Sequence, residues 1–453
     1  MKQPLVLAVY GIMLNTTALA STAFVNVNVM PMTSDTVVAG QTVIVEGDTI
    51  TAIGDVDITP IPQDATVIDG TDRFLMPGLA EMHAHVPPIG SPELGRVLTL
   101  FVANGVTTIR GMLGHRTHLQ LRQQLLDGEI FGPRLITSGP SLNGDSVSSP
   151  ADGVRKVRAQ HAAGYDFIKI HPGLSAHEYQ LIAAAASELD MPFAGHVPVA
   201  IGVEGALAAG MATIDHLDGY FAALLPADSD PTGGYGGFFD VLLADQLIEE
   251  RIDDIAAKTA AAGTWNVPTE ALFEHVVSQQ TAVELRNRPE MRYMPRKTVE
   301  QWSRSKTRQG NERGFSAEVG ARAIAIRRKL ILALHEAGAG LLLGSDAPQV
   351  FNVPGFSLHH ELGFFVAAGL TPLAALQAGT TSVADFFGSN AGIVAVGRDA
   401  DLVLLDANPL EDIANTRRIH GVMLLGVWYP AAELDERLAG YRRRGESIID
   451  SSY

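Results

Sequence analysis

Short apolar runs alternate with helical patches along most of this chain, and this alternation constrains the fold more than any other feature. Each run is five to eight residues long, which is typical of a buried strand. Eight successive strand–helix units predict an α/β fold, a (β/α)₈ TIM barrel, whose catalytic groups lie at the carboxyl ends of the strands. The predicted strands are residues 78–85, 105–110, 134–138, 166–171, 192–196, 212–217, 264–269 and 340–346, with helical patches such as 176–189, 202–209 and 321–337 between them.

Both ends of the chain have a purely strand-like pattern. Residues 23–73 alternate β-branched with polar residues, and Gly or Asp marks the turns. A similar pattern returns near the C-terminus, from residue 396 to residue 429. We therefore predict a small β-sandwich domain from residues 23–75 and 392–430, a barrel domain from residues 76–391, and a C-terminal helix or tail from residues 431–453.

Composition narrows the chemistry open to such a barrel. The chain has 453 residues, 46% of them apolar, which suits a large barrel with a smaller added unit. It contains no cysteine, which excludes disulfides, a cysteine nucleophile, thiolate metal sites and iron–sulfur clusters. A metal ion would therefore need His, carboxylate or modified Lys ligands. The formal net charge of −17 disfavours nucleic acid and anionic membranes as partners.

The first residues resemble a secretory signal peptide. One positive charge precedes a short apolar run, and the small residues Ala18 and Ala20 stand just before Ser21. The run is too short to cross a membrane, and without cysteine we expect no lipid anchor. We predict a signal peptide over residues 1–22 and export to the periplasm or the medium. The alternatives are an extra N-terminal strand or a wrongly assigned start, with a cytoplasmic protein.

Groups able to bind a metal ion stand at the ends of five predicted strands. His83 and His85 end the first strand, and alternate residues of a strand face the same side, so both imidazoles can point at one object. Later strand ends supply Lys169, His196, His216 and Asp346. Each has an ordinary alternative, since a lone His is usually hydrogen-bonded structure and a strand Lys usually extends to water. Together, at one end of one barrel, they favour a metal site.

The motifs around these residues resemble the amidohydrolase superfamily, specifically its imidazolonepropionase-like and Xaa-Pro dipeptidase-like branch. Pro77-Gly-Leu-Ala-Glu-Met-His-Ala-His resembles the first metal motif of the family, and Gly105-Val-Thr-Thr-Ile-Arg resembles its second strand. Ala368-Gly-Leu-Thr-Pro-Leu-Ala-Ala-Leu and Gly397-Arg-Asp-Ala-Asp-Leu-Val-Leu-Leu-Asp resemble its last helix and returning strands. The resemblance extends from about residue 23 to residue 429.

This resemblance implies a binuclear metal site, most often of zinc. The implied ligands are His83, His85 and Asp346 for the more buried ion, His196 and His216 for the second ion, and Lys169, carboxylated by carbon dioxide, as the bridge. A free ammonium only donates hydrogen bonds, whereas a carbamate presents two anionic oxygens. Two cations would lower the pKa of a bridging water, whose hydroxide attacks a carbonyl, and Asp346 would pass the proton to the leaving amine.

Three further residues are candidates for supporting or catalytic roles. Glu81 stands where the family usually has Asp, and it is a candidate for orienting a histidine. Arg110 ends the second strand and suits either a bidentate contact with a substrate carboxylate or a structural salt bridge. Tyr220 closely follows His216 and is either a donor to the developing oxyanion or a packed loop tyrosine.

Two segments between the later strands have an unusual composition. The glycine-rich run 233–239 follows the sixth strand and is either a mobile lid or an ordered turn. The basic stretch 281–328 is either a solvated helical face or a cap or assembly surface, which leaves a homo-oligomer open.

Together these patterns predict a metal-dependent hydrolase that cleaves amide (C–N) bonds of small peptides or N-acyl amino acids through a metal-bridging hydroxide, with a dipeptidase as the nearest specific guess. Ester, lactone or phosphotriester hydrolysis and cyclic-amide hydrolysis are alternatives on the same site, and so is deamination if Lys169 is not a ligand. The alternative role for Lys169 is to anchor the substrate by its charge. A non-catalytic barrel scaffold is the alternative of a different class, and the full set of ligand positions disfavours it.

Overall fold

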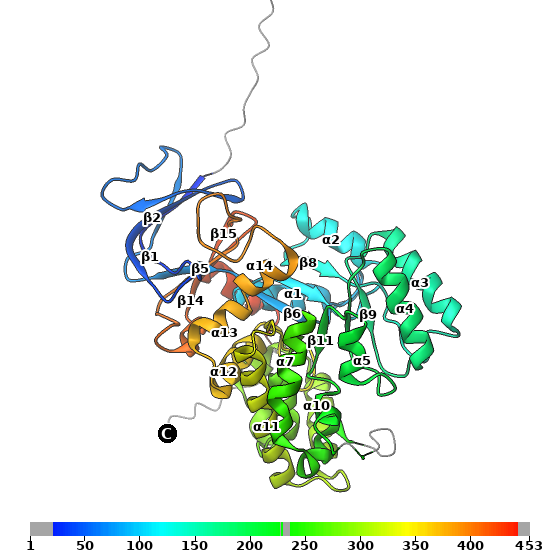
Figure 1. Ribbon diagram of the computed structural model, residues 1–453. Helices are drawn as coiled ribbons and strands as arrows, with labels where there is room; N and C mark the ends of the chain where they lie inside the picture. The colour runs from blue at the N-terminus through cyan, green and yellow to red at the C-terminus, as the bar shows by residue number, and fades with distance from the viewer. Residues whose placement is uncertain (1–20, 227, 230–235, 443–453) are drawn as a thin grey trace, which may run out of the picture.

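A computed structural model describes residues 21–226, 228–229 and 236–442 of the chain. The molecule is an α/β protein in which one mixed β-sheet lies beside a body of parallel strands and helices (Figure 1). The predicted signal peptide, residues 1–22, falls almost entirely outside the described residues and stays a prediction. Within the described part of the chain, no helix is long and apolar enough to cross a membrane.

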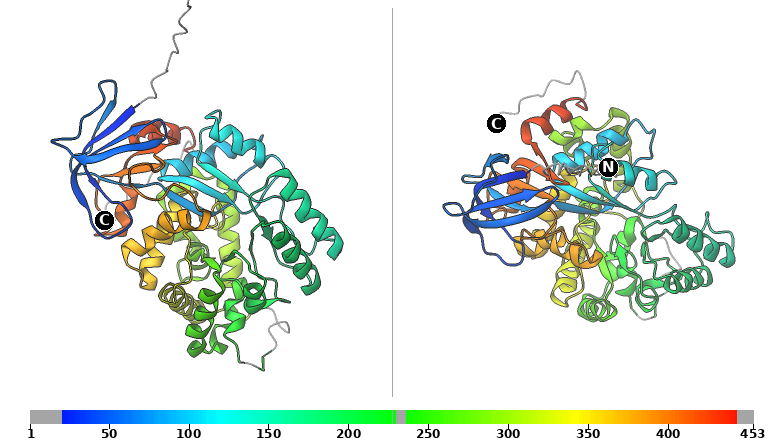
Figure 2. Two further views of the ribbon diagram at one scale, coloured as in Figure 1. Left: turned by 45° about the horizontal axis from the view of Figure 1, so that its top comes forward. Right: turned by 90° about the horizontal axis from the view of Figure 1, so that it is seen from above.

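Both ends of the chain meet in one eight-stranded sheet. Its strands are β1 (Ser21–Val29), β2 (Val38–Glu46), β3 (Thr49–Asp55), β4 (Thr66–Asp69), β5 (Phe74–Pro77), β13 (Leu402–Leu405), β14 (Ile419–Leu424) and β15 (Val427–Pro430). The central strand β5 pairs in parallel with β1 and antiparallel with β13, and Figure 2 shows the blue N-terminal strands beside the orange and red C-terminal ones. The predicted two-sheet sandwich is not confirmed, because the strands of both ends extend a single sheet.

Seven of the eight predicted barrel strands are present as parallel ladders in two sheets. The strands are β6 (Leu79–Ala84), β7 (Val106–Gly111) and β8 (Arg134–Thr137) in one sheet, and β9 (Ile168–Ile170), β10 (Phe193–Gly195), β11 (Thr213–Asp215) and β12 (Trp265–Val267) in the other. Isolated parallel bridges link the sheet edges, at Ser138 with Phe167 and at Leu142 with Ile170. The predicted eighth strand, 340–346, forms no ladder within the described residues. Isolated bridges instead connect Leu341 to β12 and Ala347 to β6.

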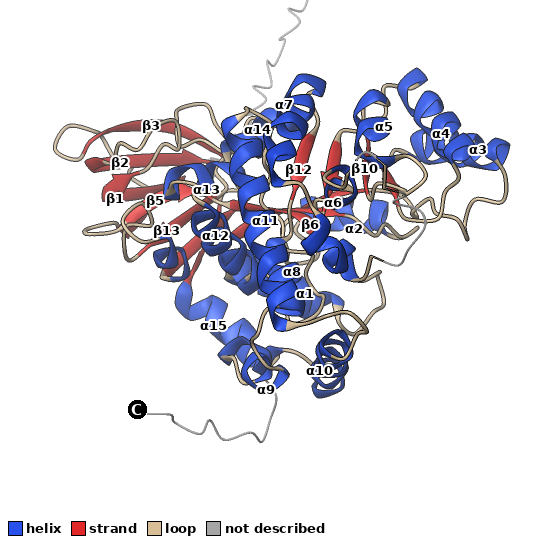
Figure 3. Cartoon of the chain, turned by 60° about the horizontal axis from the view of Figure 1, so that its bottom comes forward, coloured by secondary structure: helices blue, strands red, loops and turns tan. Residues whose placement is uncertain are grey.

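Helices surround these strands and cover them from solvent (Figure 3). The helices are α1 (Leu94–Ala103), α2 (His118–Leu126), α3 (Pro150–Ala163), α4 (Ala176–Glu188), α5 (Gly202–Ala208), α6 (Tyr220–Ala223), α7 (Ile252–Ala262), α8 (Glu270–Val277), α9 (Ala282–Arg286), α10 (Arg296–Gly310), α11 (Ala317–Glu336), α12 (Phe356–Ala368), α13 (Pro372–Ala378), α14 (Thr381–Phe387) and α15 (Ala431–Ala439), with 3₁₀ segments η1 (Phe238–Gln246), η2 (Glu249–Arg251), η3 (Pro289–Tyr293) and η4 (Ile413–Arg417). The basic stretch 281–328 is therefore mostly helical.

Local sequence explains several helix starts. Ser175 accepts a hydrogen bond from the backbone N–H of Glu178, whose side chain bonds back to Ser175, and this capping box starts α4. Thr371 caps α13, and Pro372 occupies its first turn. The predicted helix 176–189 ends one residue beyond α4, whereas α11 begins four residues before its predicted start because Ser316 provides the cap.

Candidate metal centre

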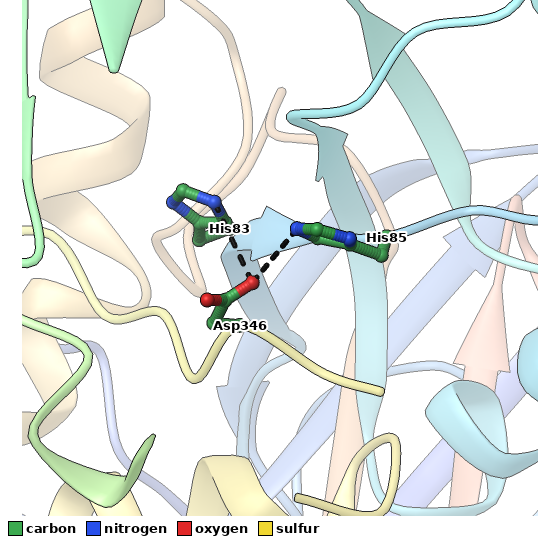
Figure 4. A group of neighbouring side chains, drawn as sticks. All are labelled: His83, His85 and Asp346. Atoms are coloured by element: carbon green, nitrogen blue, oxygen red, sulfur yellow. Dashed lines mark ion pairs between the residues drawn. The ribbon is translucent and has the colours of Figure 1, made fainter. Parts of the chain in front are cut away.

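Two histidines and a carboxylate converge at the carboxyl end of β6 (Figure 4). His83 lies in β6, His85 follows that strand, and Asp346 ends the extended segment 340–346. The Asp346 Oδ1 atom lies 2.8 Å from Nε2 of His85 and 3.6 Å from Nε2 of His83. One ligand atom of each residue lies within 4.8 Å of the others. Two imidazoles and one carboxylate at this spacing suit a divalent first-row metal ion.

A second pair of histidines lies next to the first. His196 follows β10 and His216 follows β11, and their ring centroids are 4.6 Å apart. The ring of His216 is also 4.4 Å from the ring of His83, and its Nδ1 lies 3.8 Å from Asp346 Oδ2. The structure thus gathers the predicted ligands of both ions at one end of the barrel. His196 and His216 lie outside the tighter three-residue cluster.

Three of these histidines have an oxygen against Nδ1, which leaves Nε2 for a metal ion. The contacts are His83 with Asp215 Oδ2 at 2.9 Å, His196 with Asp218 Oδ2 at 3.0 Å and His216 with Thr269 Oγ1 at 2.8 Å. Burial lowers the pKa of His83 and His216 well below the usual value. Both rings are therefore neutral, and the neutral imidazole is the form that binds metal ions.

Lys169 lies between these groups in the middle of β9. Its side chain is fully buried, and its Nζ lies 3.6 Å from Asp215 Oδ2. Gly195 in β10 makes room for it, since a Cβ there would come within 2.7 Å of Lys169 Cδ. Burial lowers the pKa of Lys169, although Asp215 and Asp346 oppose the shift. This favours the neutral amine, which is the form that adds carbon dioxide.

Buried atoms without hydrogen bonds test whether metal ions fit here. Among the described residues, Asp346 Oδ1 and Lys169 Nζ are buried and make none. The short contact between Asp346 Oδ1 and His85 is not aligned as a hydrogen bond. Buried polar atoms are costly unless a partner satisfies them. A divalent cation would satisfy Asp346, and a carbamate would convert Lys169 into a ligand, so the residues present fit the two-metal site that the sequence implies.

Asp215 links these groups and is a residue that the sequence patterns did not single out. Its Oδ1 accepts a hydrogen bond from Arg110 Nη2 at 3.2 Å, and its Oδ2 faces both His83 and Lys169. Arg110 is only 1% exposed, and its Nε donates to the carbonyl of Met82 in β6 at 2.7 Å. Of the two roles predicted for Arg110, the structure places it in the structural salt bridge. The one sequence signal for Asp215 is its position directly before His216.

Tyr220 does not take the predicted position of an oxyanion donor. Its fully buried hydroxyl donates to Asn266 of β12 at 2.9 Å and shares a hydrogen bond of 3.0 Å with Thr259 of α7. Burial raises the pKa of this phenol further above its usual value. The hydroxyl therefore ties α6 and α7 to the outside of β12, which corrects the prediction in favour of a packed tyrosine.

Glu81 joins β6 to the segment that carries Asp346. Its Oε1 accepts from the backbone N–H groups of His83 at 3.0 Å and Ser345 at 2.7 Å, and its Oε2 accepts from Ser345 Oγ at 2.5 Å. A Cβ at Gly344 would lie 2.9 Å from the His83 nitrogen, so glycine allows this close approach. Backbone hydrogen bonds from Met82 to the Leu343 carbonyl and from His85 to the Ala347 carbonyl also join β6 to this segment. Glu81 adds to them, so it helps to set the spacing of the ligands through the backbone rather than by holding an imidazole.

We expect Glu81→Ala to weaken metal binding about 10- to 100-fold, the range found when groups that orient metal ligands are removed. Loss of its carboxylate releases Ser345 and the segment that carries Asp346. Competition with a chromophoric chelator measures the affinity. The exposed Glu204→Ala is the matched control and should bind metal as the unchanged protein does. Equal affinities for both variants would show that Glu81 does not position the ligands.

Left-handed backbone conformations mark the ends of the site strands. His216, Thr269 and Asp346 have φ values of 64°, 49° and 62°, and such conformations cost residues with a Cβ about 1–3 kcal/mol each. Neighbouring groups hold them in place. Arg327 of α11 donates from Nη1 to the His216 carbonyl at 2.7 Å and from Nη2 to the Pro268 carbonyl at 2.8 Å. Arg327 is therefore a further supporting residue that the sequence patterns did not reveal.

Comparisons with known proteins agree with this arrangement. A family model described as the Amidohydrolase family matches residues 74–429. The ochratoxinase of Aspergillus niger is 24% identical over 372 residues, which cover 75% of this chain and 71% of that protein. A 5-methylthioadenosine/S-adenosylhomocysteine deaminase of Caldanaerobacter subterraneus is 44% identical over only 61 residues, and this chain covers 14% of its length.

Solved structures share the fold over nearly the whole chain. A bottromycin amidohydrolase superposes with a TM-score of 0.71 at 22% identity and covers 93% of this chain and 90% of its own. An Xaa-Pro dipeptidase with bound methionine superposes with a TM-score of 0.65 at 20% identity and covers 91% of this chain and 100% of its own.

The family match identifies a hydrolytic enzyme that acts on carbon–nitrogen bonds. The group His83, His85 and Asp346 suits the divalent metal ion that this class generally uses. The chain belongs to the Amidohydrolase family, whose model spans most of its length. The family resemblance seen in the sequence motifs is thereby confirmed.

Proposed function

We propose that the chain is a binuclear metal-dependent amidohydrolase that cleaves the amide bond of small peptides or N-acyl amino acids. The observation that carries the proposal is the position of Asp346, with Oδ1 turned to His83 and His85 and Oδ2 turned to His216. In this proposal the ligands are His83, His85 and Asp346 for one ion, His196 and His216 for the other, and carboxylated Lys169 shared between them.

The residues around the site supply orientation and proton transfer. When bound, two divalent ions, for which zinc suits this donor set, lower the pKa of a water molecule and polarise a carbonyl. In this proposal Asp346 would take the proton from the attacking water and return it to the leaving amine. Its two oxygens support this role, since Oδ1 faces His85 and Oδ2 faces His216. A hydrogen bond with Thr269 orients His216, and Asp215 lies 2.9 Å from Nδ1 of His83, so Nε2 of both rings is left for a metal ion.

The relatives support an amide as the substrate. The solved neighbours named above are an amidohydrolase and a dipeptidase, and both names denote enzymes of amide or peptide bonds. The formal net charge of −17 disfavours a polymeric anion such as nucleic acid as the substrate. Export by cleavage of residues 1–22 belongs to the same proposal, and sequencing the N-terminus of the mature protein tests it.

Metal analysis combined with a substrate panel tests the proposed function. We expect about two zinc ions per chain in protein purified without chelators, and hydrolysis of members of a panel of dipeptides and N-acyl amino acids. Chelator should abolish hydrolysis, and added zinc should restore it. A matched ester and lactone panel provides the comparison. Bound metal with cleavage of esters but of no amide would contradict an amide substrate.

A further inference from the structure

An aromatic side chain covers the second pair of histidines. Phe239 lies at the start of η1, and its ring stacks on the ring of His216 with a centroid distance of 4.9 Å and an interplanar angle of 25°. The same ring lies 6.3 Å from that of His196 at an interplanar angle of 10°. Phe238 packs against Phe239 edge-on at 4.5 Å. An apolar face is therefore placed directly against a cluster of polar groups that the metal site requires.

The backbone holds this ring in place at an energetic cost. Phe239 has φ 46° and ψ 47°, and the next residue, Asp240, has φ 60° and ψ 22°. Two successive residues with a Cβ in the left-handed region are unusual, and a bulky side chain there is an outlier. Such strain persists only where the surrounding structure enforces it, and it concentrates at sites of ligand contact. The turn therefore presents Phe239 to the imidazoles instead of following a relaxed helical path.

The same turn also borders a cavity that both polar and apolar side chains line. Gly236 and Asp240 line a cavity of about 810 Å³ together with the apolar side chains of Val197 and Leu242. Val197 directly follows His196 in the chain. Phe239 itself is half-buried, which leaves part of it open to a group held beside the second histidine pair.

We propose that Phe239 is a specificity-determining residue that selects substrates with an aromatic or large apolar group beside His196 and His216. The inference rests on the proposed function, because it assumes that substrate binds at this pair. Aromatic rings pair in offset-stacked or edge-to-face arrangements, which add attraction beyond the burial of apolar area. A small substituent would make less contact with the ring of Phe239 and would bind less tightly.

Binding of two hydroxamates tests the inference without hydrolysis. Benzohydroxamate and acetohydroxamate share a metal-chelating group and differ only in a phenyl or methyl substituent. Calorimetry on the zinc-loaded protein should show tighter binding of benzohydroxamate, and Phe239→Ala should reduce that preference about tenfold. Phe239→Leu should retain part of it. Phe131→Ala, in which the lost ring packs on Tyr429 instead, is the matched control and should leave the preference unchanged.

Hydrolysis separates this inference from the proposed function. The ratio of kcat/KM for N-acetylphenylalanine to N-acetylalanine, and for benzoylglycine to acetylglycine, should fall in at least one pair for Phe239→Ala. A preference for benzohydroxamate that survives in Phe239→Ala overturns the inference, whatever the hydrolysis results. A preference that depends on Phe239, in a protein that hydrolyses no amide, supports the inference and contradicts only the proposed amide hydrolysis.

Discussion

Lys169→Ala is expected to lower amide hydrolysis by about a thousandfold or more and to reduce the bound metal from about two ions to about one. The fully buried Lys169 has its Nζ 3.6 Å from Asp215 Oδ2, and its removal takes away the proposed shared ligand. Polarisation of a carbonyl by a metal ion contributes several kcal/mol, and about 4 kcal/mol corresponds to a thousandfold change in rate. Metal analysis by mass spectrometry and kcat/KM on the best amide of the panel measure both effects.

Two controls separate a bridging role from a purely charged one. Lys258→Ala removes an exposed lysine paired with Glu204 and Asp254 and should retain metal and activity. Acetate added to Lys169→Ala should restore part of both, because its carboxylate can occupy the space of the proposed carbamate. If Lys169 instead anchored the substrate by its charge, metal content would be unchanged and only KM would rise. Unchanged metal content and hydrolysis would exclude the bridging assignment.

The barrel strands were predictable because each is encoded locally. A short apolar run between glycine or polar residues predicts a strand whatever its neighbours are. The polar residue at the end of each run is then a candidate for the metal site, because the carboxyl ends of the strands meet at one end of the barrel. Asp346 shows the strength of this reasoning, since segment 340–346 makes only isolated bridges and still brings Asp346 within 2.8 Å of His85. The sandwich prediction is not confirmed, because local alternation does not determine how many sheets a set of strands will form.

The roles of the supporting residues could not be predicted because they depend on distant partners. Glu81 bonds to Ser345, which is 264 positions away, and Arg327 bonds to the carbonyl of His216 across 111 positions. Tyr220 is near His216 in sequence, yet its hydroxyl points to Asn266. Proximity in sequence therefore suggested the wrong role for Tyr220. The large separations in sequence gave no sign of the partner of Glu81 or of the supporting role of Arg327. The position of Phe239 could not be predicted for another reason. A bulky residue in the sequence gives no signal that its backbone will adopt a left-handed conformation.

Asp215→Ala is expected to lower the free energy of unfolding by about 3–5 kcal/mol, the usual cost of removing one partner from a buried ion pair. Asp215 is fully buried and contacts Arg110, Lys169 and His83. Burial opposes its ionisation, but Arg110 and Lys169 prevail and hold its pKa below the usual value. Its stabilising contribution is therefore present above the usual pKa and lost as the pH falls below it. Urea denaturation at neutral pH in the presence of chelator measures the loss without a contribution from bound metal.

A double variant identifies the cause of that loss. Arg110→Met combined with Asp215→Ala removes both charges. The double variant should therefore lose less free energy of unfolding than the two single variants lose together. The matched control is Glu188→Ala, which breaks an ion pair with Arg158 in which both side chains are more than 60% exposed, and it should change stability by no more than about 1 kcal/mol. Additive effects of the Arg110 and Asp215 variants would show that the two buried charges do not stabilise one another, and Asp215 would then act on the site only through His83 and Lys169.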